Sequence, residues 1–121
     1  MLVLPIKRKW FDMILEGVKA EEYKNVNTYY AKRFMTAFNA TENSVDEFIL
    51  AVKSGKYLFN RQEVLFRNGY FDNSPSFVAE ITLCIDTGNP DWGAIKGEEY
   101  FKIQIRSIHS LKNIKLNYMA V

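Results

Sequence analysis

A short charged segment, residues 19–24, holds the side chains best suited to chemistry in this chain. Lys19, Glu22 and Lys24 follow Gly17, whose conformational freedom permits a tight turn after a helix. We expect the segment to run extended, with cations on both faces. A lysine beside a carboxylate can donate hydrogen bonds to a phosphate or a developing oxyanion. The competing interpretation is an exposed ion pair, which contributes about 0–1 kcal/mol.

A second candidate group consists of Arg67, Asn68 and Tyr70. The guanidinium of Arg67 could hold a phosphate with two N–H groups, Asn68 could recognise a base edge, and Tyr70 could stack on a base. The pair Asn68–Gly69 is equally typical of a turn that needs positive φ angles. Trp92, in the next turn region, is interpreted either as a cover over the core or as a further stacking surface.

Other residues that could do chemistry lack partners. Glu80 interrupts a largely uncharged strand, so it is a candidate second carboxylate or else a solvent-facing strand residue. His109 has no neighbouring histidine or cysteine, and Cys84 is the only cysteine, so we expect no metal site, no internal disulfide and no cofactor. The apolar neighbours of Cys84 predict a buried, inert thiol. Trp10 is expected in the core.

Three helical segments are expected to position these side chains. Residues 7–16 carry an apolar stripe that ends at Gly17, and a second helix begins after Asn27 or Thr28. A capping box, Ser44–Glu47, opens a third helix that ends at Gly55. Residues 27–56 should therefore form a helical layer between strands.

The rest of the chain has the pattern of a sheet. Residues 1–5 and 64–70 predict strands, and residues 77–86 and 100–108 alternate between apolar and polar side chains, which indicates half-buried strands. The segments 72–75 and 87–90 have turn chemistry. The apolar tail, residues 111–121, is expected to pair or pack. Helices first and long strands later indicate an α+β domain with a mostly antiparallel sheet.

The composition fits one domain spanning residues 1–121. Hydrophobic residues make up 48% of the chain, too many for a disordered protein, and the net charge is only +2. Proteins that wrap long duplexes carry more positive charge, so any nucleic-acid contact should be a local patch or pocket. No apolar stretch approaches the roughly 20 residues of a membrane span. We therefore expect a soluble, cytoplasmic protein without membrane contact.

The segment from Lys9 to Lys24 resembles the opening signature of the ASCH family. In that signature, a helix ends in glycine and is followed by lysine, an acidic residue and a basic residue at fixed offsets. Gly17, Lys19, Glu22 and Lys24 occupy these positions, although the family usually has arginine at the last. Residues 64–70, 87–94 and 99–102 resemble phage and prophage members. Nearly the whole chain takes part in the resemblance, with residues 35–60 matching least.

The resemblance implies a PUA-like β-barrel with the N-terminal helices packed against it and a cleft between barrel and helix. It also implies a role on RNA or modified nucleosides. The first hypothesis is therefore an RNA- or nucleotide-binding domain whose cleft is lined by Lys19, Glu22, Lys24 and Arg67, with Asn68, Tyr70 and Trp92 as further binding residues. The oligomeric state stays open.

Two alternatives come from the same resemblance. Some relatives look like amidohydrolases that remove an acyl group from cytidine, with a threonine nucleophile at the position of Glu22. If hydrolysis of an acylated cytidine or of RNA survives here, Glu22 would activate water as a general base and Lys19 would stabilise the oxyanion. The other alternative is a phage protein that binds a host protein.

Overall fold

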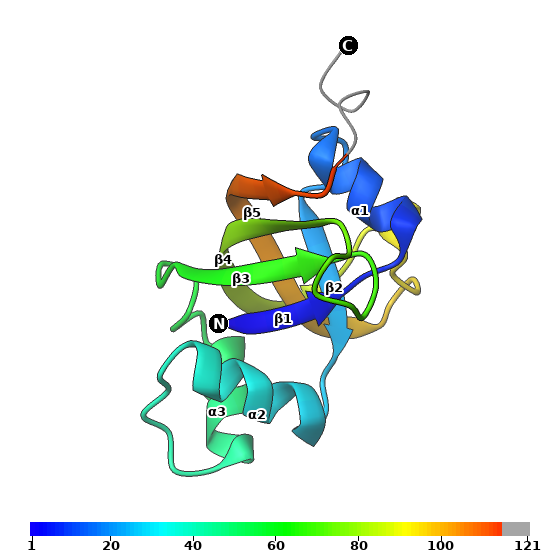
Figure 1. Ribbon diagram of the computed structural model, residues 1–121. Coiled ribbons are helices and arrows are strands. Elements are labelled where there is room, and N and C mark those ends of the chain that lie inside the picture. Colours follow the sequence, from blue (N-terminus) through cyan, green and yellow to red (C-terminus); the bar gives the residue numbers. More distant parts are fainter. Residues whose placement is uncertain (115–121) are drawn as a thin grey trace.

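Residues 1–114 are described by the computed structural model of the chain (Figure 1). Along the chain the elements are β1 (Leu2–Pro5), α1 (Arg8–Leu15), β2 (Glu21–Asn25), α2 (Thr28–Ala37), α3 (Val45–Lys53), β3 (Gln62–Arg67), β4 (Ser76–Thr87), the short 3-10 helix η1 (Pro90–Trp92) and β5 (Glu99–Lys112). The expected elements are all present, and their ends differ from the expected ones by a few residues.

One five-stranded mixed sheet organises the fold, in the order β1-β3-β4-β5-β2. The pair β1–β3 is parallel, and the other three pairs are antiparallel. The expected α+β class with a mostly antiparallel sheet is therefore confirmed. The sheet is open, however, because its edge strands β1 and β2 do not pair with each other. The backbone edge of β1 instead meets helix α2, where Arg33 Nη2 donates a hydrogen bond to the Val3 carbonyl at 3.2 Å.

The two longest strands supply the core. The inward-facing side chains of β4 from Phe77 to Leu83 have no exposed surface, and neither have Phe101 and Ile103 of β5. The expected alternation is confirmed in β5 from Phe101 to Arg106, whereas β4 is covered on both faces, since Val78 is only 7% and Thr82 only 2% exposed. Strand β3 ends at Arg67, before the expected Tyr70, because the chain turns at once and the Asn68 N–H donates to the Pro75 carbonyl at 2.9 Å.

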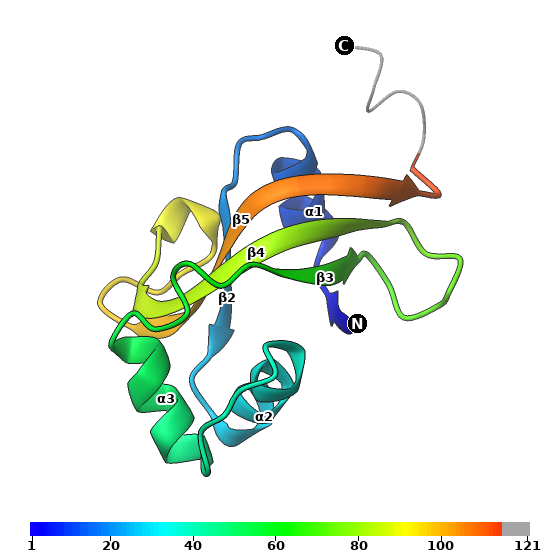
Figure 2. The ribbon, with the colours of Figure 1, turned by 90° about the vertical axis from the view of Figure 1, so that its left-hand side faces the viewer.

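The helices pack on this buried face at two ends of the sheet (Figures 1 and 2). On α1, Phe11 packs against Phe77 with 5.0 Å between ring centroids, and on α2, Phe34 meets Phe101 at 5.1 Å. The expectation that Trp10 belongs to the core is only half met. Phe11 turns inward and is 1% exposed, which leaves Trp10 at the side of the helix, partly exposed.

Side-chain caps fix where α2 and α3 begin. Asn27 Oδ1 accepts a hydrogen bond from the Tyr30 N–H at 2.9 Å, and Ser44 Oγ accepts one from the Glu47 N–H at 3.1 Å. The carboxylate of Glu47 reaches back to the Asn43 N–H at 3.0 Å, one residue earlier than a standard capping box. These caps confirm both expected helix starts.

The expected pairing of the tail is seen only at its beginning, since β5 continues to Lys112 and residues 115–121 lie outside the described part of the chain. Cys84 is half-buried rather than buried, and this burial raises the pKa of its thiol. In residues 1–114, no helix has both the length and the apolar character needed to cross a membrane.

Candidate functional site

A cavity of about 830 Å³ opens between the two unpaired edges of the sheet. Strands β1 and β2 form its facing sides, and the start of α1, helix α2 and the β3–β4 and β4–β5 loops complete it. The lining residues are Val3, Leu4, Pro5, Ile6, Lys7, Trp10, Glu22, Tyr23, Lys24, Asn25, Tyr29, Tyr30, Arg33, Asn68, Gly69, Tyr70, Trp92, Gly93, Ile95 and Tyr100. Its volume lies in the range of sites that hold small ligands and cofactors.

Strand β2 brings two of the predicted residues, Glu22 and Lys24, to the wall of this cavity. They are two positions apart, so the pleat of the strand sends both side chains to one face. The ammonium of Lys24 lies above the ring of Tyr30, 5.6 Å from its centroid. Burial lowers the pKa of Lys24, and the nearby Glu22 carboxylate opposes this shift.

Lys19 lies behind the wall rather than in it. Its side chain is 0% exposed and does not line the cavity. Its ammonium is 3.2 Å from Glu22 Oε1 and donates a hydrogen bond to the Trp92 carbonyl at 2.8 Å. Burial lowers the pKa of Lys19, and its contact with Glu22 opposes that shift. The pair is therefore buried, and Lys19 ties β2 to the β4–β5 loop.

The aromatic rings of Trp10 and Tyr23 enclose the Lys19 ammonium. Their centroids lie 4.8 Å and 4.9 Å from Nζ, a distance at which a cation is attracted to the ring face. Gly93 makes this packing possible, because a Cβ added there would lie 2.9 Å from Trp10 Cζ2. The Tyr23 hydroxyl accepts a hydrogen bond from the Asn89 N–H at 2.9 Å, a second link between β2 and the β4–β5 loop.

One oxygen of Glu22 is open to the cavity. Its Oε1 is close to Lys19 Nζ and accepts a hydrogen bond from the Tyr23 N–H at 3.3 Å. Its Oε2 has no hydrogen bond from residues 1–114, while no fully buried side-chain polar atom of these residues lacks a partner. Because Glu22 lines the cavity, Oε2 must reach its surface, where it can accept a hydrogen bond from a ligand.

The second predicted group divides at the start of the β3–β4 loop, residues 68–75. Asn68 and Tyr70 line the cavity, but Arg67 does not. Arg67 Nε donates to the Gly69 carbonyl at 3.3 Å, and its Nη1 lies 3.7 Å from the Asp72 carboxylate. The amide of Asn68 donates to the Ile6 carbonyl at 3.1 Å, so part of its hydrogen-bonding capacity holds the loop in place.

The arginine that lines the cavity is Arg33, not Arg67 as the sequence suggested. It lines the cavity from α2, and its guanidinium lies 5.3 Å from the centroid of the Tyr29 ring. The sequence carries one signal for it, since Tyr29 and Arg33 are four residues apart and share a helix face. Lys7, directly before α1, also lines the cavity.

The remaining candidates lie elsewhere. The Glu80 carboxylate accepts a hydrogen bond from Ser107 Oγ at 3.2 Å and lies 3.8 Å from Arg61, and Glu80 does not line this cavity. His109 Nε2 is 3.6 Å from Glu63 at the surface. Among the residues that the structure describes, no three histidine, cysteine or acidic side chains come together as a metal site would require.

The chain was compared with protein-family models, curated proteins and solved structures. The chain matches no family model, no curated protein and no solved structure.

Proposed function

We propose that this chain is an ASCH-type, PUA-like domain that binds a nucleotide or a short segment of RNA in the cavity between β1 and β2. One observation carries the proposal. Three cations, a single carboxylate and seven aromatic rings converge on one hollow: Lys7, Lys24, Arg33, Glu22, Trp10, Tyr23, Tyr29, Tyr30, Tyr70, Trp92 and Tyr100. This is the combination that holds a phosphate, a base edge and a base face together.

The cations give the cavity an anionic preference. Lys24 has no ion pair within residues 1–114. Arg33 donates one hydrogen bond to the Val3 carbonyl through Nη2, so its other guanidinium N–H groups can bind an anion. A phosphate bound by both would gain charge-assisted hydrogen bonds in a partly desolvated site. Glu22 repels phosphate, so it divides the cavity into an anion-binding part and a part that accepts hydrogen bonds from a base.

The fold supports the PUA-like assignment in one respect. The sheet is curled enough for its two edge strands to face each other across the cavity, as the strands of an opened barrel would. Helix α1 stands beside this opening and contributes Trp10 to the cavity wall. The resemblance in sequence implies a ligand cleft between the barrel and the N-terminal helix, and a cavity wall that includes Trp10 of α1 is compatible with it.

The proposal is tested by removing the cations one at a time. Lys24→Ala and Arg33→Ala should each weaken binding of short RNA about tenfold, measured by fluorescence anisotropy. In the wild type, the logarithm of affinity should fall with the logarithm of salt with a slope of about −2 to −4. Lys24→Ala should reduce the size of that slope by about one.

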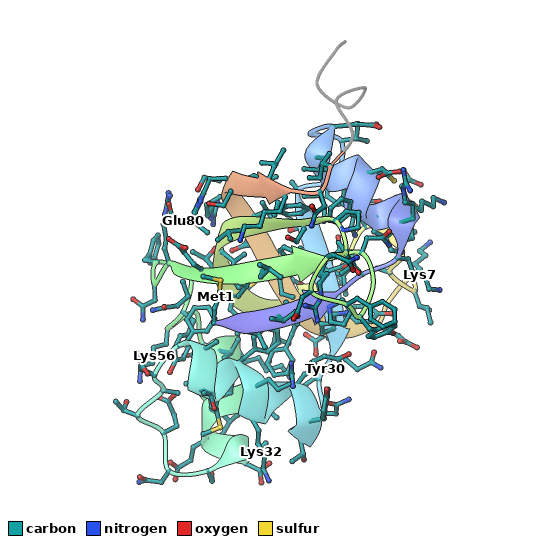
Figure 3. All side chains as sticks on the ribbon, in the orientation of Figure 1. Met1, Lys7, Tyr30, Lys32, Lys56 and Glu80 are labelled. Atoms are coloured by element: carbon teal, nitrogen blue, oxygen red, sulfur yellow. The ribbon has the colours of Figure 1, made fainter. Side chains whose placement is uncertain are left out.

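Two matched controls accompany this test. Lys32 is an exposed lysine next to Arg33, on the side of α2 that faces away from the sheet (Figure 3), and Lys32→Ala should leave affinity unchanged within about twofold. Arg67→Ala should likewise have little effect, because Arg67 does not line the cavity. Absence of binding at low salt, or equal losses from all four variants, would overturn the proposal.

Hydrolysis of an acylated cytidine is a second candidate, and Glu22 Oε2 is the observation that favours it. A carboxylate oxygen open to a cavity can act as a general base toward water. Lys19 is turned toward Trp92, so of the two lysines on the 19–24 segment Lys24 is the one that lines the cavity, where an oxyanion would form. Acylated cytidines should then be turned over by the wild type and not by Glu22→Gln. Equal turnover by both proteins, or none by either, would exclude this reaction.

A further inference from the structure

Large aromatic side chains stand exposed at the mouth of the cavity. Tyr70 is 80% exposed and lines the cavity, and Phe71 beside it is 75% exposed. Tyr29, on α2, also lines the cavity and is 61% exposed. Single exposed apolar residues are normal on a protein surface, but a group of aromatic rings at the rim of one polar cavity marks a binding surface.

The loop that carries Tyr70 and Phe71 has a fixed backbone. Ser74 Oγ accepts a hydrogen bond from the Phe71 N–H at 3.3 Å, and the Ser74 N–H donates to the Phe71 carbonyl at 3.0 Å. Gly69 has a φ of +130°, and a Cβ there would lie 2.5 Å from Ser74 Oγ. Only glycine therefore permits this turn. The loop holds its two aromatic side chains outward, with most of their surface open to solvent.

Neither ring is used by the fold. In residues 1–114, no pair of packed rings includes Tyr70 or Phe71, and no cation lies over either of them. Most of the surface of each ring is therefore available to a ligand. A nucleotide held by Lys24, Arg33 and Glu22 would fill the cavity and leave these rings at its exit, where the next base of a chain would emerge.

We propose that Tyr70 and Phe71 form a stacking surface that extends the cavity, so that the site takes single-stranded RNA of two or more nucleotides in preference to a mononucleotide. This inference rests on the proposed function. Stacking on an aromatic ring tolerates any base and strengthens binding about tenfold for each base stacked. The phosphate that links the bases would pass the cations of the cavity, and this charge complementarity favours RNA over a protein segment as the occupant.

The experiment compares ligand length in three proteins. A mixture of the four nucleoside monophosphates and random RNA pools of two, four and eight nucleotides compete with a labelled RNA, at low and at high salt. The proteins are the wild type, the Tyr70→Ala/Phe71→Ala variant and Phe59→Ala. Phe59 is 90% exposed and does not line the cavity, so its variant controls for loss of an exposed aromatic ring.

In the wild type, the dinucleotide pool should bind at least about tenfold tighter than the monophosphates. The double variant should lose this gain, measured as the ratio of its affinities for the dinucleotide pool and for the monophosphates, while Phe59→Ala should keep the wild-type ratio. The gain should persist at high salt, because stacking is screened less than charge. Replacing both residues by tryptophan should preserve it.

Two outcomes would overturn the inference while leaving the proposed function intact. The first is equal affinity for one nucleotide and for longer RNA, and the second is a length gain that survives in the double variant, since added phosphates would then explain it. Absence of binding to any of these ligands would remove both the inference and the proposed function.

Discussion

Strand β2 and the β3–β4 loop both line the cavity and are built in opposite ways. On β2, Glu22 is 6% exposed and is paired with Lys19, whose side chain is completely buried. On the loop, Tyr70 is 80% exposed and has no ring partner in the described residues. Strand β2 is held by a buried ion pair, Lys19–Glu22, whereas the β3–β4 loop presents an exposed side chain that contributes little to the packing of the fold.

The difference separates stability from binding. A buried pair costs several kcal/mol to break, because the remaining charge has no partner and no water. An exposed ring costs the folded state almost nothing to remove. Substitutions on β2 should therefore change both folding and ligand affinity, whereas substitutions on the loop should change affinity alone. The following predictions test this contrast, starting with the largest effect.

Removing the buried cation should destabilise the fold most. Lys19→Met leaves the Glu22 carboxylate buried without its partner and the Trp92 carbonyl without its hydrogen bond. We expect the free energy of unfolding, measured by chemical denaturation, to fall by about 3 kcal/mol. Tyr70→Ala should change it by less than about 0.5 kcal/mol.

A double variant checks the cause. Lys19→Met combined with Glu22→Leu removes both charges, so it should recover a large part of the loss, because paired charges can be replaced by apolar residues at little cost. If the double variant is less stable than Lys19→Met alone, the buried charge is not the source of the effect, and the contrast between the two sides fails.

Gly93→Ala should have an intermediate effect. Its φ of +100° strains any other residue, and the added methyl would also push against Trp10 at 2.9 Å. Gly97 has a similar φ of +85° with open space around it, so Gly97→Ala reports the backbone cost alone. We expect Gly93→Ala to be less stable than Gly97→Ala by about 1 kcal/mol, with weaker RNA binding. Equal stability of the two variants would show that the Trp10 ring can move away from the added methyl at no cost in stability.

The smallest predicted effect is a pH dependence of binding. The pKa of Lys24 is lowered below its ordinary value of 10.5, so on raising the pH this ammonium loses its proton before exposed lysines do. The lost charge weakens phosphate binding, so affinity for adenosine monophosphate should decline as the pH rises, and this decline should begin at a lower pH than exposed lysines would produce. Lys24→Arg keeps its charge throughout and should flatten the curve. Parallel curves for the two proteins would contradict this assignment.

Local patterns in the sequence were enough to predict the elements. The alternation along the first half of β5 and the caps at Asn27 and Ser44 each depend on neighbours in the chain, and each is found in the structure. The open sheet could not be predicted in this way. Whether β1 and β2 pair depends on how far the sheet curls, which is a property of all five strands together.

The candidate site shows the same limit. From the sequence, Lys19 and Arg67 had the same standing as Glu22 and Lys24, because residue type and spacing do not reveal which way a side chain turns. The structure buries Lys19 behind the wall and ties Arg67 to its own loop, and it brings Arg33 to the cavity from a helix whose only sequence signal was the spacing of Tyr29 and Arg33.

The sequence by itself determined the class of fold, the positions of the strands and helices, and the segment 19–24 as one side of the site. The tertiary structure alone decided which cations meet in the cavity and which oxygen of Glu22 stays open to it. Periodicity and helix caps depend on residues that are close together in the sequence, so they can be recognised in a short segment of it. Convergence of side chains from α2, β2 and two loops depends on packing between distant segments, which no local pattern records.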